Sequence, residues 1–464
     1  MTRSAKIGWS VAVSVILTAM AGTSLAVCCA ISFQRGLKLW DEGVAAASRG
    51  DLDTAISKYD VALRTKMGAR YAGILHSNRG LAYNSKGLLD RALLDFAEAL
   101  RLHPGLVEAY VGRSFAYIGK GEIEKALSDT NEALRLDPNS KDAYHNRAIT
   151  FLNQRKVGKA IADFGEAIRC DPDNADLYAE RGNAFLTDGQ YASAIASFES
   201  AIRISPWLSA AYLGRDFAWE KRAYELLNEG IKAASDRKYD EAMKFYTGAL
   251  ESHPGIRNRA VILCNRATTL SYLKRREESA RDYDEAIRLD PNFFQAYYNR
   301  AINYRQRGQM AEAVQDFTEA LRLNPKYAPA YVNRAAIYFR QKKLDRARAD
   351  WLNAVENIEG IELERRPQLL NNIAWQLATS PAPVCRDDKT AIRAATLACE
   401  LTNWTRSDFL DTLAAAYAEA GDFASAIARQ NQAIQLARGS SKENDDMKQR
   451  LRLYQQQKPY RNAK

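Results

Sequence analysis

Small and aromatic residues recur along the chain at positions that share one face of a helix. Ala92 is followed by Phe96 four residues later and by Ala99 three residues after that. Residues spaced i, i+4 and i+7 lie on the same side of an α-helix. Small side chains let a second helix approach closely, and the aromatic ring fills the space beside them. The pattern predicts helices packed in pairs, and its aromatic member returns at Phe164, Phe198, Tyr246, Tyr283 and Phe317.

Prolines mark where each predicted helix pair ends. Four of them are spaced 34 residues apart, and three more follow at intervals of 48, 37 and 34: Pro104, Pro138, Pro172 and Pro206, then Pro254, Pro291 and Pro325. Proline lacks a backbone N–H, so it ends the second helix and begins the next pair. Within the pairs, glycines that suit a helix C-terminus mark the turns, at Gly87, Gly121, Gly189 and Gly308. The first helix of a pair carries a tyrosine near its start, as at Tyr110, Tyr144, Tyr178 and Tyr297.

This combination of tyrosine, small residues, aromatic residue and proline resembles the tetratricopeptide repeat, from about residue 36 to residue 440. The resemblance implies an all-α fold, a right-handed superhelical solenoid of helix-turn-helix units whose first helices line a concave groove. Full repeats are expected at 36–69, 73–106, 107–140, 141–174, 175–208, 223–256, 260–293, 294–327, 328–361 and 407–440, with a degenerate unit at 367–402.

The repeats divide into two related arrays. Pro104 and Pro291 are separated by 187 positions, and so are Pro138 and Pro325, and each array has a three-residue insertion after its first repeat. We expect an N-terminal segment at 1–35, a first array of five repeats at 36–208 and a junction at 209–222. A second array of four repeats follows at 223–361, then the degenerate and final repeats at 362–440 and a capping helix with a basic tail at 441–464. A long or bent helix at the junction would let the two arrays reorient.

Arginine replaces the leucine that the family usually has before the small residue of the first helix. An aspartate follows each of these arginines after 16 residues, except that Arg181 has Ser197 at that place. We interpret the pairs as bridges that clamp the two helices of a repeat, rather than as a ladder for an acidic ligand. The pairs are Arg79–Asp95, Arg113–Asp129, Arg147–Asp163, Arg266–Asp282, Arg300–Asp316 and Arg334–Asp350, with the charges reversed in Glu42–Lys58.

Asparagine often precedes these arginines, at Asn78, Asn146, Asn265, Asn299 and Asn333. In the family this position faces the groove, and an amide offers both a donor and an acceptor to a peptide backbone. The asparagines are therefore candidate groove residues, the alternative being local helix packing. Chaperone C-terminus capture is not expected, because the lysine of the family's carboxylate clamp is absent. Ser77, Val111, His145 and Ala179 stand at the matching places.

The N-terminal segment contains no charged residue from Ile7 to Phe33. Such a stretch exceeds the about 20 residues that a spanning helix needs. We expect a single membrane anchor through residues 7–33, with the bulk of the chain periplasmic or otherwise extracytoplasmic. The alternatives are a cleaved signal peptide, with secretion of the remainder, and a lipoprotein signal ending at Cys28.

Composition and candidate chemistry argue against catalysis. The net charge is +10, but basic residues are scattered among acidic ones, so nucleic-acid binding is not expected. The four histidines stand in no catalytic arrangement, and there is no metal or phosphate-binding motif. No cofactor and no small-molecule substrate are expected. Cys385 and Cys399 are candidates for a disulfide, with a buried hydrophobic role for Cys399 as the alternative.

These observations predict a membrane-tethered, non-catalytic scaffold that binds partner proteins or peptides in its groove. Two alternatives stay open at this point. One is a structural or assembly subunit of a larger complex, and the other is a regulatory subunit of a separately encoded enzyme.

Overall fold

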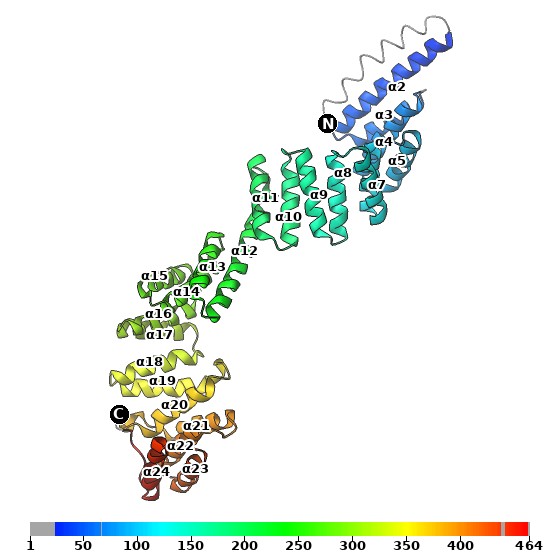
Figure 1. Ribbon diagram of the computed structural model, residues 1–464. Coiled ribbons are helices and arrows are strands. Elements are labelled where there is room, and N and C mark those ends of the chain that lie inside the picture. Colours follow the sequence, from blue (N-terminus) through cyan, green and yellow to red (C-terminus); the bar gives the residue numbers. More distant parts are fainter. Residues whose placement is uncertain (1–23, 66, 438–440, 463–464) are drawn as a thin grey trace. The chain divides into compact units, whose positions relative to one another are not determined.

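The computed structural model describes residues 24–65, 67–437 and 441–462, and within these ranges the fold is all-α (Figure 1). The described chain forms 23 α-helices and two short 3-10 helices and contains no strand. It divides into two compact units, which meet between residues 222 and 223. In each unit, consecutive helices pack as antiparallel pairs, and each pair stacks on the next.

The first unit contains five helix pairs followed by the first half of α12. In order, the pairs are α2 (Ser24–Ser48) with α3 (Leu52–Leu63), α4 (Ala69–Ser85) with α5 (Leu89–Leu102), α6 (Val107–Gly119) with α7 (Ile123–Leu136), α8 (Lys141–Asn153) with α9 (Val157–Cys170), and α10 (Ala175–Thr187) with α11 (Tyr191–Ile204).

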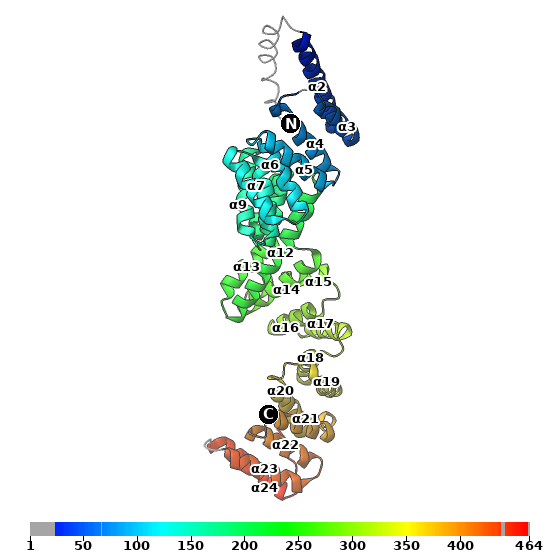
Figure 2. The ribbon, with the colours of Figure 1, turned by 90° about the vertical axis from the view of Figure 1, so that its right-hand side faces the viewer.

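The second unit begins with the second half of α12 (Ser209–Ser235), which pairs with α13 (Tyr239–Glu251). Its further pairs are α14 (Ile256–Tyr272) with α15 (Arg276–Leu289), α16 (Phe294–Gln306) with α17 (Met310–Leu323), and α18 (Ala328–Arg340) with α19 (Leu344–Glu356). After η2 (Ile358–Gly360) come α20 (Arg366–Thr379), η3 (Pro383–Cys385) and α21 (Asp388–Leu401). The last elements are α22 (Ser407–Glu419), α23 (Phe423–Leu436) and α24 (Ser441–Gln455), which Figure 2 shows from the side.

The expected junction at 209–222 lies inside α12, a helix of 27 residues. The chain therefore passes from one unit to the other without leaving the helix. The reorientation of two arrays about this segment stays a prediction.

The prediction of an N-terminal membrane anchor, and with it of a membrane-anchored protein, is wrong. In the part of the chain that the structure describes, no helix has the length and apolar character to cross a membrane. Residues 7–23 of the predicted anchor lie outside the described residues. The rest of it enters α2, where Arg35, Lys38, Asp41 and Glu42 follow after only a short uncharged stretch. A spanning helix needs about 20 predominantly apolar residues.

The turn between the two helices of a pair has the same left-handed backbone in most repeats. Gly87 and Gly121 adopt φ of 72° and 73° there, as the sequence suggests for glycine. Arg155 and Lys274 hold the same position in their repeats with φ of 58° and 63°. A side chain in this region carries a conformational cost. The helix packing on both sides of the turn therefore determines its conformation even where glycine is missing.

An aromatic ring forms the centre of each tightly packed repeat. Phe198 is fully buried between two glycines, Gly182 of the first helix in its own pair and Gly214 of α12. A Cβ atom added at Gly182 or Gly214 would lie 2.7 or 2.5 Å from this ring. Phe96 stands between Gly80 and Gly112 in the same way. The ring thus sets both the spacing within a pair and the spacing to the next pair.

We expect Gly182→Ala to destabilise the first unit by about 1–3 kcal/mol, because the added methyl overpacks the Phe198 contact. The matched control is Gly165→Ala in the interior of α9, where nothing lies within 4 Å of an added Cβ. That variant should gain about 0.5–1 kcal/mol from helix propensity. Urea unfolding followed by circular dichroism measures both, and equal effects would contradict the role given to the ring.

Candidate interaction surface

The six predicted arginine–aspartate pairs all lie within hydrogen-bonding distance. In each pair, Nε and Nη2 of the arginine donate to the two carboxylate oxygens at 2.7–2.9 Å. The aspartates are buried, with Asp129 5% exposed, whereas the arginine side chains keep a modest exposure. This two-pronged geometry is the strong form of the charge-assisted bond. The reversed pair is present as well, with Lys58 Nζ 2.5 Å from Glu42 Oε2.

Several of these arginines also reach back to the preceding repeat, a contact that the sequence analysis missed. Nη1 of Arg147 donates to Asn131 at 2.9 Å, and Nη1 of Arg300 donates to Asp284 at 2.6 Å. In both cases the acceptor stands 16 residues before the arginine, on the second helix of the preceding pair. One guanidinium therefore joins three helices. A polar residue 16 positions before the arginine is the sequence feature that could have predicted this contact.

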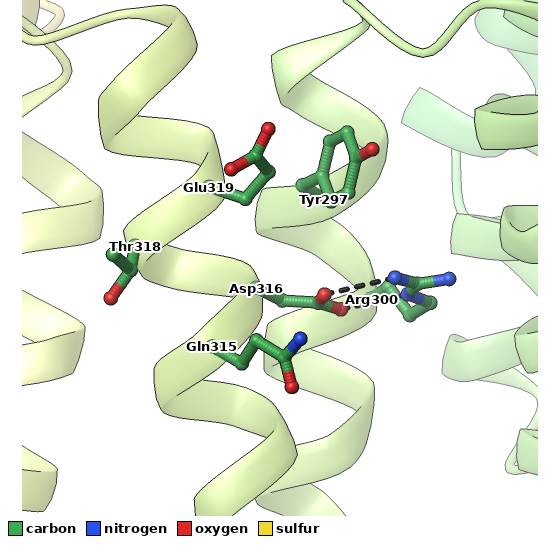
Figure 3. A pocket seen from close by; sticks show the side chains of 6 residues that line it. All are labelled: Tyr297, Arg300, Gln315, Asp316, Thr318 and Glu319. Atoms are coloured by element: carbon green, nitrogen blue, oxygen red, sulfur yellow. Dashed lines mark hydrogen bonds and ion pairs between the residues drawn. The ribbon is translucent and has the colours of Figure 1, made fainter.

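Tyrosines three residues before the arginines hold the guanidinium groups from another side. The guanidinium carbon lies 5.3–5.7 Å from the ring centroid in five repeats, at Tyr110, Tyr144, Tyr178, Tyr297 and Tyr331. Such cation–π contacts are favourable at this range. Figure 3 shows the arrangement at Arg300, beside an open hollow of about 410 Å³ that Tyr297, Gln315 and Glu319 help to line. Because Arg300 is already bonded to two aspartates, this hollow has no cation left for an acidic ligand.

Arg181 differs from the other arginines because no carboxylate faces it. Its one hydrogen bond to a described residue runs from Nε to Ser197 Oγ at 3.3 Å. The place 16 residues earlier holds Gly165, which leaves that side open. Burial lowers the pKa of Arg181, whereas the hydrogen bond with Asp163 raises the pKa of Arg147. The fifth pair therefore contains a half-buried cation without a counter-ion.

The candidate groove asparagines use their amide nitrogens inside the array. Asn146 is buried and donates to Val111 O and Ser114 Oγ of the preceding repeat, at 3.0 and 2.9 Å. Asn265 donates to Val261 O within its own helix, at 2.9 Å. For Asn146, these contacts favour the packing interpretation over the groove interpretation.

The other two asparagines of the second unit reach toward the preceding repeat. Asn299 approaches Thr268 Oγ1 at 3.4 Å, and Asn333 donates to Tyr298 OH at 3.2 Å and to Pro329 O at 2.8 Å. Arg305 donates to Asn333 Oδ1 at 2.6 Å. In the first unit, Asn78 is half-buried, and Glu180 forms a pair with His145. That hydrogen bond raises the pKa of His145.

The first helices present a second, apolar set of side chains on the face that points away from the bridges. The ninth residue of a repeat follows the arginine by two positions, which places it about 200° around the helix. Leu81 and Phe115 hold this position and are 39% and 52% exposed. Leu213 and Phe217 on the first half of α12 are 73% and 50% exposed. We call the surface formed by these sides of the first helices the first-helix face.

Cys385 and Cys399 are both buried and unpaired. Burial raises the pKa of the Cys399 thiol to about 12, which keeps it protonated. Both residues belong to the apolar core around α20 and α21.

The stacked pairs with their repeating small and aromatic positions define the class of helical solenoids. Profiles described as tetratricopeptide repeat match residues 116–175, 145–206, 260–293, 294–327 and 317–349. In these segments the chain consists of tetratricopeptide repeats, as the sequence predicted.

Similar proteins share only a short part of the chain. The DnaJ homolog subfamily C member 7 of Mus musculus is 35% identical over 82 residues, which are 18% of this chain and 17% of that protein. The small glutamine-rich tetratricopeptide repeat-containing protein 2 of Saccharomyces cerevisiae is 33% identical over 76 residues, or 16% and 21% of the two chains. The chain thus spans about a fifth of the length of these curated relatives.

Solved structures resemble the chain more extensively but at lower identity. The yeast Tom70 structure covers 91% of this chain and 96% of its own, with 17% identity and a TM-score of 0.33. A tetratricopeptide repeat protein from Parabacteroides merdae covers 60% and 99%, with 19% identity and a TM-score of 0.34. Similarities at this level carry no functional argument.

The structural role of the bridges can be tested by exchanging one position between neighbouring repeats. Ser197→Asp supplies Arg181 with the missing carboxylate and should stabilise the first unit by about 1 kcal/mol. Asp163→Ser removes the partner of Arg147 and should destabilise the first unit by about 1–3 kcal/mol, because a buried charge-assisted bond is lost. Urea unfolding of both variants checks the signs. A Ser197→Asp protein that is less stable than the parent would contradict the bridge interpretation.

Proposed function

We propose that this protein is a non-catalytic scaffold that binds extended segments of other proteins along the first-helix face. The observation that carries the proposal is the exposure of large apolar side chains at the same repeat position of three first helices, at Leu81 on α4, Phe115 on α6 and Phe217 on α12. A soluble surface rarely repeats such exposure without a partner to cover it. The polar groups next to this face are largely bonded to one another, so apolar contacts are the ones still available.

The geometry of the face suits an extended polypeptide. First helices contact each other directly from pair to pair, as α4 does with α6 and α6 with α8. Leu81 leans toward the next first helix, with its Cδ2 atom 3.1 Å from an ideal Cβ at Gly112. Apolar side chains of a bound segment would pack between neighbouring helices, and the partner that this chemistry selects is a peptide with apolar residues at intervals.

The asparagine row of the second unit stays part of the proposal as a secondary contact. The nitrogens of Asn265 and Asn299 are used within the array, so their role toward a ligand would be to accept hydrogen bonds from its backbone through Oδ1.

We expect the combined variant Asn265→Ala, Asn299→Ala, Asn333→Ala to bind partners more weakly while its thermal midpoint stays within a few degrees of the parent. The physical reason is the loss of acceptors for the partner backbone. Partner binding measured by quantitative co-purification, together with a thermal melt, separates this outcome from the packing alternative. An unchanged affinity with a lowered midpoint would assign the row to packing.

The central test is Phe115→Glu, which places a charge in the exposed apolar row of the first unit. We expect at least a tenfold loss of partner recovery after in-cell crosslinking and quantitative mass spectrometry, because a partner side chain would have to desolvate the new carboxylate.

The matched control is Leu94→Glu on the second helix α5, where the leucine is 74% exposed and lies outside the first-helix face. This variant should recover the same partners as the parent. Equal losses in the two variants would contradict the proposed surface.

A further inference from the structure

The last described residues of the chain fold back onto two first helices of the second unit. After α24 the backbone turns at Gln457, with φ of 56°, and residues 458–462 run in irregular conformation to α20. The backbone N–H of Asn462 donates to Thr379 O at 2.8 Å. Figures 1 and 2 both show the C-terminal end beside α20.

Tyr460 is the apolar anchor of this segment. Its ring lies 5.8 Å from the ring of Trp375 on α20, with an interplanar angle of 42°. The guanidinium of Arg450 on α24 is 5.4 Å from the Tyr460 ring and 5.5 Å from the Trp375 ring. Arg450 is itself fixed by Asp411 of α22, with its Nε 2.8 Å from Oδ1. The tyrosine therefore enters an aromatic and cationic site that other parts of the fold hold in place.

Arg461 supplies a charged anchor beside it. Its Nη2 lies 2.5 Å from Oε2 of Glu419, at the end of α22. The Glu419 side chain is only 14% exposed and has a second cation nearby, Arg386 at 3.4 Å. Removal of the segment would thus leave Glu419 with one cation rather than with none, so the acidic site can persist without Arg461.

Tyr460 packs against the residue of α20 that holds the same repeat position as the exposed residues of the first-helix face. Counted along the repeat at 367–402, Trp375 is the ninth residue, as Leu81 and Phe115 are in theirs. Those two side chains are 39% and 52% exposed, whereas Trp375 is packed against Tyr460. Residues 458–462 thus cover the ninth repeat position on α20 in the second unit. The same position is exposed at Leu81 and Phe115 in the first unit.

We propose that the first-helix face of α20 and α22 is a peptide-binding site, and that residues 458–462 occupy it as an intramolecular ligand. The partner that this site selects carries an aromatic residue followed directly by a basic one. Such a partner displaces the chain's own Tyr460 and Arg461. The inference rests on the proposed function in one respect, that first helices accept extended segments.

Tethering explains how a short segment can hold the site. A segment linked by a few residues has an effective concentration in the millimolar range. A peptide of the same sequence supplied in solution can therefore bind only modestly to the isolated site and still fill it when attached. Displacement then requires a partner that binds more tightly than the chain's own residues or that engages further repeats.

The test uses the chain ended after Gln456, which keeps α24 whole, and a fluorescein-labelled peptide of residues 457–462. Fluorescence anisotropy should show saturable binding to the shortened chain and at least tenfold weaker binding to the full chain, whose site is occupied. A peptide with Tyr460→Ala should lose binding, and one with Tyr460→Phe should keep it. Glu419→Gln in the shortened chain should weaken the parent peptide and leave an Arg461→Ala peptide unaffected.

A second protein keeps the test independent of truncation. The full chain with Tyr460→Ala and Arg461→Ala retains every residue of α24 and should bind the parent peptide as the shortened chain does. Absence of binding to both proteins, each shown to be folded by circular dichroism, would overturn the proposal, as would equal binding of a scrambled peptide. If that happens while Phe115→Glu still reduces partner recovery, the site on α20 and α22 fails and the general scaffold function stands.

Discussion

The contact on which the solenoid depends is the burial of one aromatic ring between glycines or alanines of neighbouring first helices. Phe96, Phe198 and Tyr246 each fill a space that a single added methyl group would close. Because protein interiors are packed to nearly crystalline density, such a ring acts as a spacer with little tolerance. Because the ring recurs from repeat to repeat, the distance between successive helix pairs is uniform. This distance determines which side chains of neighbouring pairs can reach one another.

The arginine bridges follow from this uniform spacing. A guanidinium reaches its own aspartate and the preceding second helix only because both helices stand at fixed distances from the first helix. Arg300 uses three nitrogens on two carboxylates from different pairs. The bridges thereby satisfy most charges on that side of the array. The opposite side of the first helices carries exposed apolar residues at Leu81, Phe115 and Phe217, and this difference between the two sides is the basis of the proposed binding surface.

The sequence alone was sufficient to predict the structural features that recur from unit to unit. Ten units in phase predicted the helix pairs, and the 16-residue spacing predicted which arginine lies near which aspartate. It was less informative where a contact joins separate repeats, as between Arg147 and Asn131, because the acceptor at that place changes from repeat to repeat, being Asn131 in one and Asp284 in another. The turns at Arg155 and Lys274 lack the expected glycine. The docking of Tyr460 could not be predicted, because residues 458–462 have no periodic pattern. The uncharged N-terminal stretch misled the prediction, since hydropathy alone suggested a membrane anchor.

Ser197 stands where the other paired arginines have an aspartate, and this difference affects how the protein unfolds under force or heat. In a solenoid, each unit is held only by its neighbours, so cohesion varies from place to place along the chain. The α10–α11 pair has the weakest clamp among the arginine-bearing pairs and lies at the end of the first unit. Opening should begin there and spread outward, with amide protons of this pair exchanging with solvent before those of α6 to α9. The serine at position 197 therefore determines which helix pair of the array unfolds first.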